Sequence, residues 1–217
     1  MRRLVVIEFL TVDGVMQGLG SPEEDTDGGF VHGGWGAPFA PAVHEAVTAD
    51  GPPGASGYLL GRRTYEKMAQ FWPHQPDDDP MARHLNATPK HVATRTLTDL
   101  RWSGAEVLAG DLGPAVVDLL SHGDGDVAVL GSGDLVRQLM LLDLVDHVRL
   151  FVHPLLLGTG KRLFRELPAP RRLRLTAVGT TSLGTVALGY DVLRDPGAQD
   201  VVERRPPGAA RRPVRRR

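Results

Sequence analysis

The sequence predicts an α/β domain with a mainly parallel central sheet, helices on both faces and an antiparallel hairpin at one edge. Short apolar runs rich in β-branched residues alternate with segments of helical period as far as residue 153. This alternation is typical of parallel strands joined by crossover helices. Two final apolar runs, 171–182 and 184–194, meet at Leu183-Gly184, which indicates the hairpin.

The first strand is expected at Leu4 to Val12, "LVVIEFLTV", and ends at the turn pair Asp13-Gly14. Its nearly continuous apolar character is typical of a strand that is covered on both faces, so we place it in the centre of the sheet. Residues 13–36 follow with eight glycines and no regular period. Because loops of this length in compact domains are usually functional or disordered, this segment is a candidate part of the site.

The remaining elements follow from periodicity and from turn residues. Helical spacing of apolar residues predicts helices at 37–50, 62–72, 81–88, 112–123 and 132–143, and Asp111 is expected to cap the fourth of these. Clustered or alternating apolar residues predict strands at 56–61, 90–96, 105–110, 126–131 and 145–158, the last ending in a turn.

The chain divides into a core and a basic tail. Residues 195–217 hold seven arginines against three acidic residues, about +4, so residues 1–194 carry about −5 (18 basic against 23 acidic). The tail is rich in Pro, Gly, Ala and Arg and has no apolar period, so we expect it to be disordered. A nucleic-acid arm is the less favoured interpretation of this tail, and a solvated extension is the favoured one.

Composition excludes several classes of protein. The chain has no cysteine, which excludes disulfides, thiolate nucleophiles and the zinc motif of a cytosine-type deaminase. No apolar run reaches the length of a membrane span, and the basic opening lacks a signal-peptide cleavage pattern. We therefore expect a cytoplasmic protein. The acidic loop residues Glu23, Glu24, Asp25 and Asp27 lack a fixed ligand spacing, so we expect a solvated loop and no metal site.

One strand end has the chemistry of a phosphate site. The run "YLLG" ends at Gly61, which allows a tight turn, and Arg62, Arg63 and Thr64 begin the next helix. Free backbone N–H groups at a helix start favour an anion, and guanidinium groups bind phosphate through two parallel hydrogen bonds. The alternative is that both arginines are merely solvated.

Two other strand ends have similar chemistry. Gly131-Ser132-Gly133 follows an apolar strand and opens a helix, although it lacks the third glycine of a dinucleotide fingerprint. Thr94-Arg95-Thr96 follows another strand. Ligands of open α/β sheets bind beyond the carboxyl ends of strands, so the three ends reinforce one another.

These segments carry a resemblance to a known family. The motifs "TVDGVMQ", "LLGRRTYE", "KHVATRT", "VLGSGDLVRQL" and "HPLLLGTGKRLF" make residues 1–194 similar to the dihydrofolate-reductase-like superfamily. Within it, the chain resembles the C-terminal reductase domain of the bacterial riboflavin-biosynthesis deaminase-reductase. The resemblance implies a three-layer reductase domain, NADPH as the cofactor and a homodimer with a contact near residues 148–164.

The resemblance also implies which residues bind the cofactor. Arg62, Thr94 and Arg95 would surround the adenosine 2′-phosphate, whereas Arg63 would point away. The residues expected near the pyrophosphate and the nicotinamide are Thr64, Gly131, Ser132, Gly133 and Asp134, and the cofactor set is completed by Gly61 and Leu135.

Three residues are candidates for the catalytic end. Asp13 follows the first strand and would contact substrate or nicotinamide, although Asp-Gly is first of all a turn pair. Trp35 would stack on a substrate ring or anchor the long loop in the core. Glu45, with His44 beside it, lies on the expected substrate helix and would relay a proton; the alternative is an exposed helix glutamate.

The sequence thus predicts an NADPH-dependent reductase that transfers a hydride to a small, heterocyclic or carbonyl-bearing metabolite. The absence of the deaminase zinc motif leaves the riboflavin precursor in doubt as the substrate. A nucleotide-binding module or structural dimer without turnover is the alternative from another class.

Overall fold

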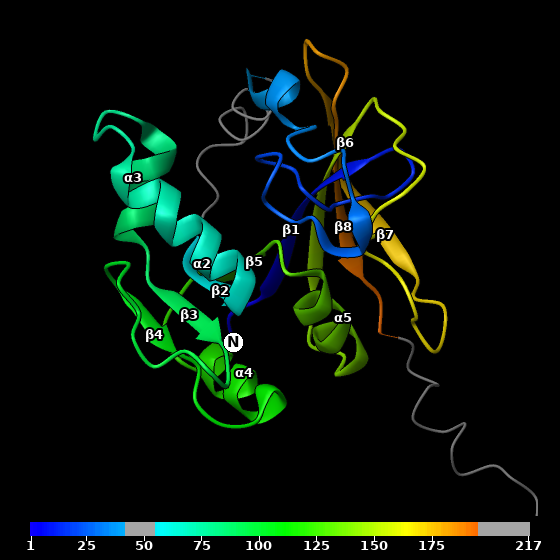
Figure 1. Cartoon of the computed structure of the whole chain (residues 1–217). Helices are drawn as coiled ribbons and strands as arrows, with labels where there is room; N and C mark the ends of the chain where they lie inside the picture. Colours follow the sequence, from blue (N-terminus) through cyan, green and yellow to red (C-terminus); the bar gives the residue numbers. More distant parts are fainter. Residues whose placement is uncertain (42–54, 195–217) are drawn as a thin grey trace, which may run out of the picture.

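The computed structural model describes residues 1–41 and 55–194, which form one mixed sheet between two layers of helices (Figure 1). The sheet has eight strands in the order β4-β3-β2-β5-β1-β6-β8-β7. The strands are β1 (Leu4–Thr11), β2 (Ala55–Gly61), β3 (Lys90–Ala93), β4 (Ala105–Val107), β5 (Asp126–Leu130), β6 (His147–His153), β7 (Leu173–Thr180) and β8 (Val186–Val192).

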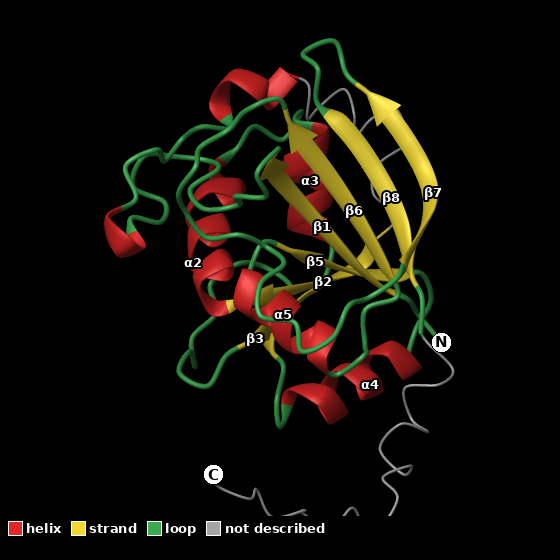
Figure 2. Ribbon diagram, turned by 90° about the vertical axis from the view of Figure 1, so that its right-hand side faces the viewer, coloured by secondary structure: helices red, strands yellow, loops and turns green. Residues whose placement is uncertain are grey.

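The helices divide between the two faces of the sheet (Figure 2). They are α2 (Arg62–Phe71), α3 (Pro80–Ala87), α4 (Leu112–Ser121) and α5 (Gly133–Leu141), with 3₁₀ turns at Asp27–Gly29, Ala37–Phe39 and Trp72–His74. Tyr65 of α2 and Leu85 of α3 pack in one core, whereas Val116 of α4 and Val136 of α5 pack in the other. This three-layer arrangement confirms the predicted fold class.

The central position of β1 is also confirmed. It pairs in parallel with β5 on one side and with β6 on the other. Val6 and Leu10 join the core under α4 and α5, and Ile7 joins the core under α2 and α3. A strand that buries both faces needs apolar residues at successive positions, which explains the continuous run in the sequence.

The predicted C-terminal hairpin is present. β7 and β8 pair antiparallel, and β8 pairs antiparallel with β6. β6 therefore lies inside the sheet, between β1 and β8. The dimer contact expected near residues 148–164 stays a prediction. β7 instead forms the edge, and its eight residues are all exposed.

Other predicted elements are shorter than expected or lie outside the described residues. The helix expected at 37–50 begins with the 3₁₀ turn Ala37–Phe39, and its candidates His44 and Glu45 lie outside the described residues, as does the tail 195–217. Asp111 does occupy the N-cap of α4, but its side chain makes no capping hydrogen bond. None of the helices in the described part of the chain is long and apolar enough to span a membrane.

Candidate functional site

The three strand ends with the chemistry of a phosphate site, those of β2, β3 and β5, lie next to one another. β3, β2 and β5 are consecutive parallel neighbours in the sheet, so their carboxyl ends meet at one edge. Figure 1 shows α2 and α5 starting from this edge on opposite faces of the sheet. The predicted convergence of Gly61, Thr94 and Gly131 at one edge is therefore present in the structure.

A serine joins the ends of β2 and β5. The Gly61 backbone N–H donates a hydrogen bond of 2.9 Å to Ser132 Oγ, and the Ser132 hydroxyl donates to Thr64 Oγ1 at 2.6 Å. A Cβ on residue 61 would lie 2.8 Å from that Ser132 Oγ, so the glycine permits the close approach. Ser132 itself has a left-handed backbone, with φ 67°.

Neither helix start is capped by the side chain of its own N-cap residue. Gly61 is the N-cap of α2 and Ser132 is the N-cap of α5, and neither makes a side-chain capping hydrogen bond. The first turn of α2 also contains no acidic residue. Helix starts of this kind attract anions through their free N–H groups and their positive dipole ends.

Arg62 points toward the end of β3. Its Nη1 donates to Thr96 Oγ1 at 3.1 Å, and its Nε lies 3.8 Å from a Glu66 carboxylate oxygen. The Thr94 hydroxyl oxygen orders this turn by accepting from the N–H groups of residues 96 and 97 at 3.2 and 3.1 Å. Arg95 is exposed on the same turn. Two arginines and two threonines thus gather beside the start of α2.

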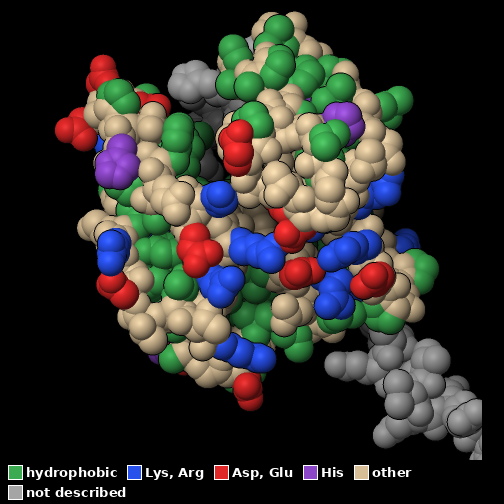
Figure 3. All heavy atoms as spheres, viewed as in Figure 1, with side chains coloured by type: hydrophobic (Ala, Val, Ile, Leu, Met, Phe, Trp, Pro, Cys, Tyr) green, Lys and Arg blue, Asp and Glu red, His purple; other side chains and the backbone are tan. Residues whose placement is uncertain are grey.

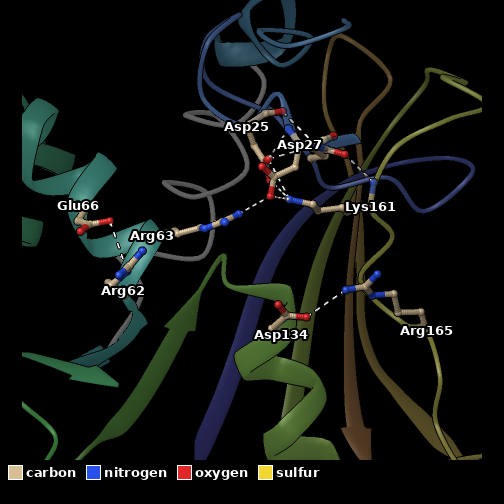
Figure 4. Close-up of polar contacts among 9 residues, drawn as sticks. Asp25, Asp27, Arg62, Arg63, Glu66, Asp134, Lys161 and Arg165 are labelled. Carbon is tan, nitrogen blue, oxygen red and sulfur yellow. Dashed lines mark hydrogen bonds and ion pairs between the residues drawn. The ribbon is translucent and has the colours of Figure 1, made fainter. Parts of the chain in front are cut away.

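Arg63 points away from the end of β3, which Arg62 contacts, and reaches the long loop after β1 (Figure 4). Its guanidinium contacts the Asp27 carboxylate, and Lys161 Nζ contacts Asp27 and Asp25 at 2.8 and 2.6 Å. Hydrogen bonds from Lys161 and Arg63 lower the pKa of the Asp27 carboxyl to about 2. Gln17 Oε1 also accepts a hydrogen bond from the Lys161 backbone N–H at 2.9 Å. Together these contacts of Arg63, Asp27, Asp25, Lys161 and Gln17 form a tether that holds the long loop.

A second ion pair lies below this tether. Asp134, in the first turn of α5, accepts a 3.0 Å hydrogen bond from Arg165 Nη2. Leu135, which was expected in the cofactor set, is buried and packs in the core under α5. A Cβ on residue 133 would lie 2.8 Å from the Met16 sulfur, so the long loop crosses close to this helix start.

The two ion-paired clusters surround an open cavity. Its volume is about 430 Å³, and it is lined by Gln17, Asp27, Gly28, Phe30, Thr159, Gly160, Lys161, Arg162 and Arg165. Figure 3 shows basic and acidic side chains interspersed across the middle of this face. The cations that line the cavity, Lys161, Arg162 and Arg165, are thus each paired with a neighbouring carboxylate.

Asp13 is held in place by contacts within the protein. Its Oδ1 accepts from the Thr11 hydroxyl at 2.6 Å, and its Oδ2 accepts from the Gly158 N–H at 2.8 Å. These hydrogen bonds, with that of Thr11 the strongest, lower the pKa of the carboxyl. Asp13 therefore joins the end of β1 to the loop after β6, and its expected contact with substrate or nicotinamide stays a prediction.

Trp35 anchors the long loop. Its side chain is 7% exposed, packs with Val15 and Phe30, and donates from Nε1 to the Gln17 carbonyl oxygen at 2.7 Å. Its ring meets the His153 ring edge-on at 5.5 Å between centroids. Of the two roles expected from the sequence, the structure shows the anchor, and stacking on a substrate stays a prediction.

Two buried polar residues near the site were not selected from the sequence. Glu8 of β1 is 4% exposed, and its Oε1 has no hydrogen-bond partner in the described part of the chain. Burial raises the pKa of its carboxyl to about 8. His153, at the end of β6, is fully buried, and its Nε2 likewise has no partner among the described residues. A single charged or polar residue inside an apolar strand was the available signal for each.

The fold is that of an α/β domain of the RibD C-terminal type. Residues 2–188 match the family of RibD C-terminal domains, and the chain belongs to this family. The fold also matches a crystal structure of a putative riboflavin biosynthesis protein from Shewanella sp. PV-4, with a TM-score of 0.61 and 18% identity over 88% of this chain and 99% of that one.

Further similar proteins extend this comparison. A pyrimidine reductase-like protein from Corynebacterium diphtheriae shares the fold, with a TM-score of 0.57 and 14% identity over 89% of this chain and 93% of the other. Two Bacillus subtilis proteins, YyaP and YwjB, are 28% and 29% identical over 136 and 133 residues, which cover 61% of this chain and 71% of each relative. Both carry the description uncharacterized protein.

Removal of the Ser132 hydroxyl should destabilise the protein. Ser132→Ala leaves the partly buried Gly61 N–H without its partner, which should lower the free energy of unfolding by about 1–2 kcal/mol in a urea titration. Ser132→Gly loses the same hydrogen bond but relieves the left-handed backbone, so it should be about 1 kcal/mol more stable than Ser132→Ala. Equal stability of Ser132→Ala and the unchanged protein would contradict this role.

Glu8→Gln should stabilise the protein in a pH-dependent way. Because the pKa of this carboxyl is near 8 in the folded protein and near 4.5 without burial, the folded state holds a proton that the unfolded chain releases between these values. The stability of the unchanged protein relative to the variant should therefore fall by about 1.4 kcal/mol per pH unit as the pH rises through this window. Unfolding titrations at pH 5, 6.5 and 8, each about a unit and a half apart, measure this slope.

The exposed residue Glu23 supplies the control for this experiment. Glu23→Gln changes the same chemical group outside the core, so its stability difference from the unchanged protein should not vary with pH in this way. A pH-independent difference for Glu8→Gln would show that the carboxyl is not held protonated by burial.

Proposed function

We propose that this protein is an NADPH-dependent reductase that transfers a hydride to a small metabolite with a heterocyclic ring or a carbonyl group. The observation that carries the proposal is the meeting of three parallel strand ends with two helix starts that the side chains of their own N-cap residues do not cap. Phosphate groups bind at such positions because backbone N–H groups and guanidinium groups converge there. Membership of a family of reductase domains supports the same proposal.

The residues present fit a phosphate-bearing dinucleotide. Arg62, with Thr94 and Arg95 on the neighbouring turn, would hold a 2′-phosphate, and the Thr96 hydroxyl keeps the Arg62 guanidinium at that turn. The backbone at 131–133 would hold the pyrophosphate with Thr64. Asp134 is unfavourable beside an anion, but its ion pair with Arg165 offsets the negative charge.

NADPH supplies a hydride when bound, and the reduced group then needs a proton on the neighbouring atom. The lowered pKa of Asp13 keeps this carboxylate ionised at neutral pH, so it is a poor proton donor. Glu8 retains its proton at neutral pH but is enclosed by the core. Solvent or a residue of the loops around the cavity therefore delivers the proton in this proposal.

Calorimetric titration of the purified protein with NADPH and with NADH tests the proposal. Micromolar binding of NADPH and much weaker binding of NADH are expected, since the 2′-phosphate supplies the contact with Arg62. Lack of binding to either dinucleotide would contradict the proposal. NADPH that binds tightly but is oxidised by no acceptor in a screen of heterocycles and carbonyl compounds would favour a nucleotide-binding module.

Arg62→Ala should weaken NADPH selectively. Loss of a guanidinium–phosphate contact should cost about 2 kcal/mol, roughly thirtyfold in the dissociation constant of NADPH, with little change for NADH. Arg63→Ala is the matched control, because Arg63 contacts Asp27 rather than the end of β3. This variant should affect both dinucleotides alike. Equal weakening of NADPH and NADH by Arg62→Ala would refute the assigned role.

We also propose that two copies associate through β7. The exposed edge strand carries Leu175 and Val178, which are 54% and 65% exposed, and an unpaired edge readily accepts another strand. Val178→Arg should convert a dimer to a monomer in sedimentation experiments, whereas Val117→Arg on the exposed face of α4 should not. A dimer that survives Val178→Arg would exclude this contact.

A further inference from the structure

His153 stands apart from the cofactor-binding groups but lies at the same edge of the sheet. It is the last residue of β6 and is paired in register with Thr11, the last residue of β1. Its side chain is fully buried, and burial lowers the pKa of its imidazole to about 4. The ring is therefore neutral at physiological pH, with one nitrogen that donates and one that accepts.

The two ring nitrogens of His153 have different environments. Nδ1 lies 2.9 Å from the hydroxyl oxygen of Thr185, a fully buried residue of the turn before β8. Nε2 is buried and has no hydrogen-bond partner among residues 1–41 and 55–194. A buried polar atom without a partner destabilises the folded state, so its presence at the edge that holds the candidate site calls for a functional explanation.

Aromatic rings surround the imidazole. The centroids of the Phe39, Trp35 and Phe9 rings lie 4.8, 5.5 and 6.3 Å from that of His153. Trp35 is buried, whereas Phe9 and Phe39 remain partly exposed. Half-buried aromatic rings beside one buried polar atom that lacks a described partner have the composition of a small-molecule site. Flat conjugated molecules stack on such faces, and their polar edges select the hydrogen-bonding partner.

We propose that His153 anchors the molecule that accepts the hydride, through a hydrogen bond from a flat, conjugated ring to Nε2 while that ring packs against Phe9 and Phe39. Thr185 is a positioning residue, because its hydroxyl fixes the orientation of the imidazole. That the bound molecule is the hydride acceptor depends on the proposed reductase function. That a flat ring binds here depends only on the geometry around His153.

Substitutions of His153 separate its two nitrogens. His153→Asn keeps a polar group near the position of Nδ1, within reach of Thr185, but removes the group at Nε2. His153→Gln places an amide near the position of Nε2 and loses the contact with Thr185. Pterin is a suitable probe because it is flat, is fluorescent and has both donors and acceptors on one edge.

The experiment measures the fluorescence anisotropy of pterin while each protein variant is added. His153→Asn should raise the dissociation constant about tenfold, and His153→Gln should change it by less than about threefold. Phe39→Ala should also weaken binding by up to about tenfold through loss of ring stacking. Unchanged affinity in His153→Asn would overturn the proposal, as would absence of binding to the unchanged protein at its highest soluble concentration.

Two measurements keep these outcomes distinct. Near-ultraviolet circular dichroism establishes whether each variant is folded. If His153→Asn is not folded, His153→Gln and Phe39→Ala test the proposal. It is then overturned unless His153→Gln changes the dissociation constant of pterin by less than about threefold and Phe39→Ala raises it. NADPH titration of the same preparations tests the proposed function separately. Pterin binding with the stated order of variants but without NADPH binding would refute the reductase and support the His153 site. NADPH binding without the stated order of pterin dissociation constants among the variants would refute the His153 site alone.

Discussion

The hydrogen bond from the Gly61 N–H to Ser132 Oγ is the contact on which the geometry of the candidate site depends. It joins the ends of β2 and β5 where one helix leaves toward each face of the sheet. Since the Ser132 hydroxyl also reaches Thr64, a single side chain sets the spacing of both helix starts. The arginines after Gly61 and the loop that holds Asp27 are arranged around this junction.

The sequence predicted the centre of the sheet well because β1, β2 and β5 bury consecutive residues and therefore both faces. A run such as that from Leu4 to Thr11 leaves little choice of position, and the glycine at Leu183-Gly184 marks the hairpin clearly. The place of β6 was harder to predict. The sequence predicted a strand here that ends in a turn, and only the pairings with β1 and β8 show that the strand is interior.

The candidate site was predicted in part. The anion-friendly strand ends followed from glycine and arginine at local spacing, and their adjacency followed from the parallel sheet. Contacts between residues distant in sequence could not be predicted in this way. The Arg63–Asp27 pair joins positions 36 residues apart, and the ring cluster around His153 brings together a strand end, a loop tryptophan and a 3₁₀ turn. The local periodicity of apolar residues gives no information about such contacts.

The ion pairs beside the cavity bear on selectivity among anions. Arg63 and Lys161 are already paired with carboxylates. A small anion such as inorganic phosphate would have to replace one of these carboxylates. Its binding free energy would then be only the difference between two ion pairs of comparable strength. A ligand with several phosphate groups would engage Arg62 and both helix starts at the same time, and its contacts would reinforce one another. Under the proposed function, the carboxylates of this loop would compete with small anions for Arg63 and Lys161, whereas a larger polyvalent ligand would still bind.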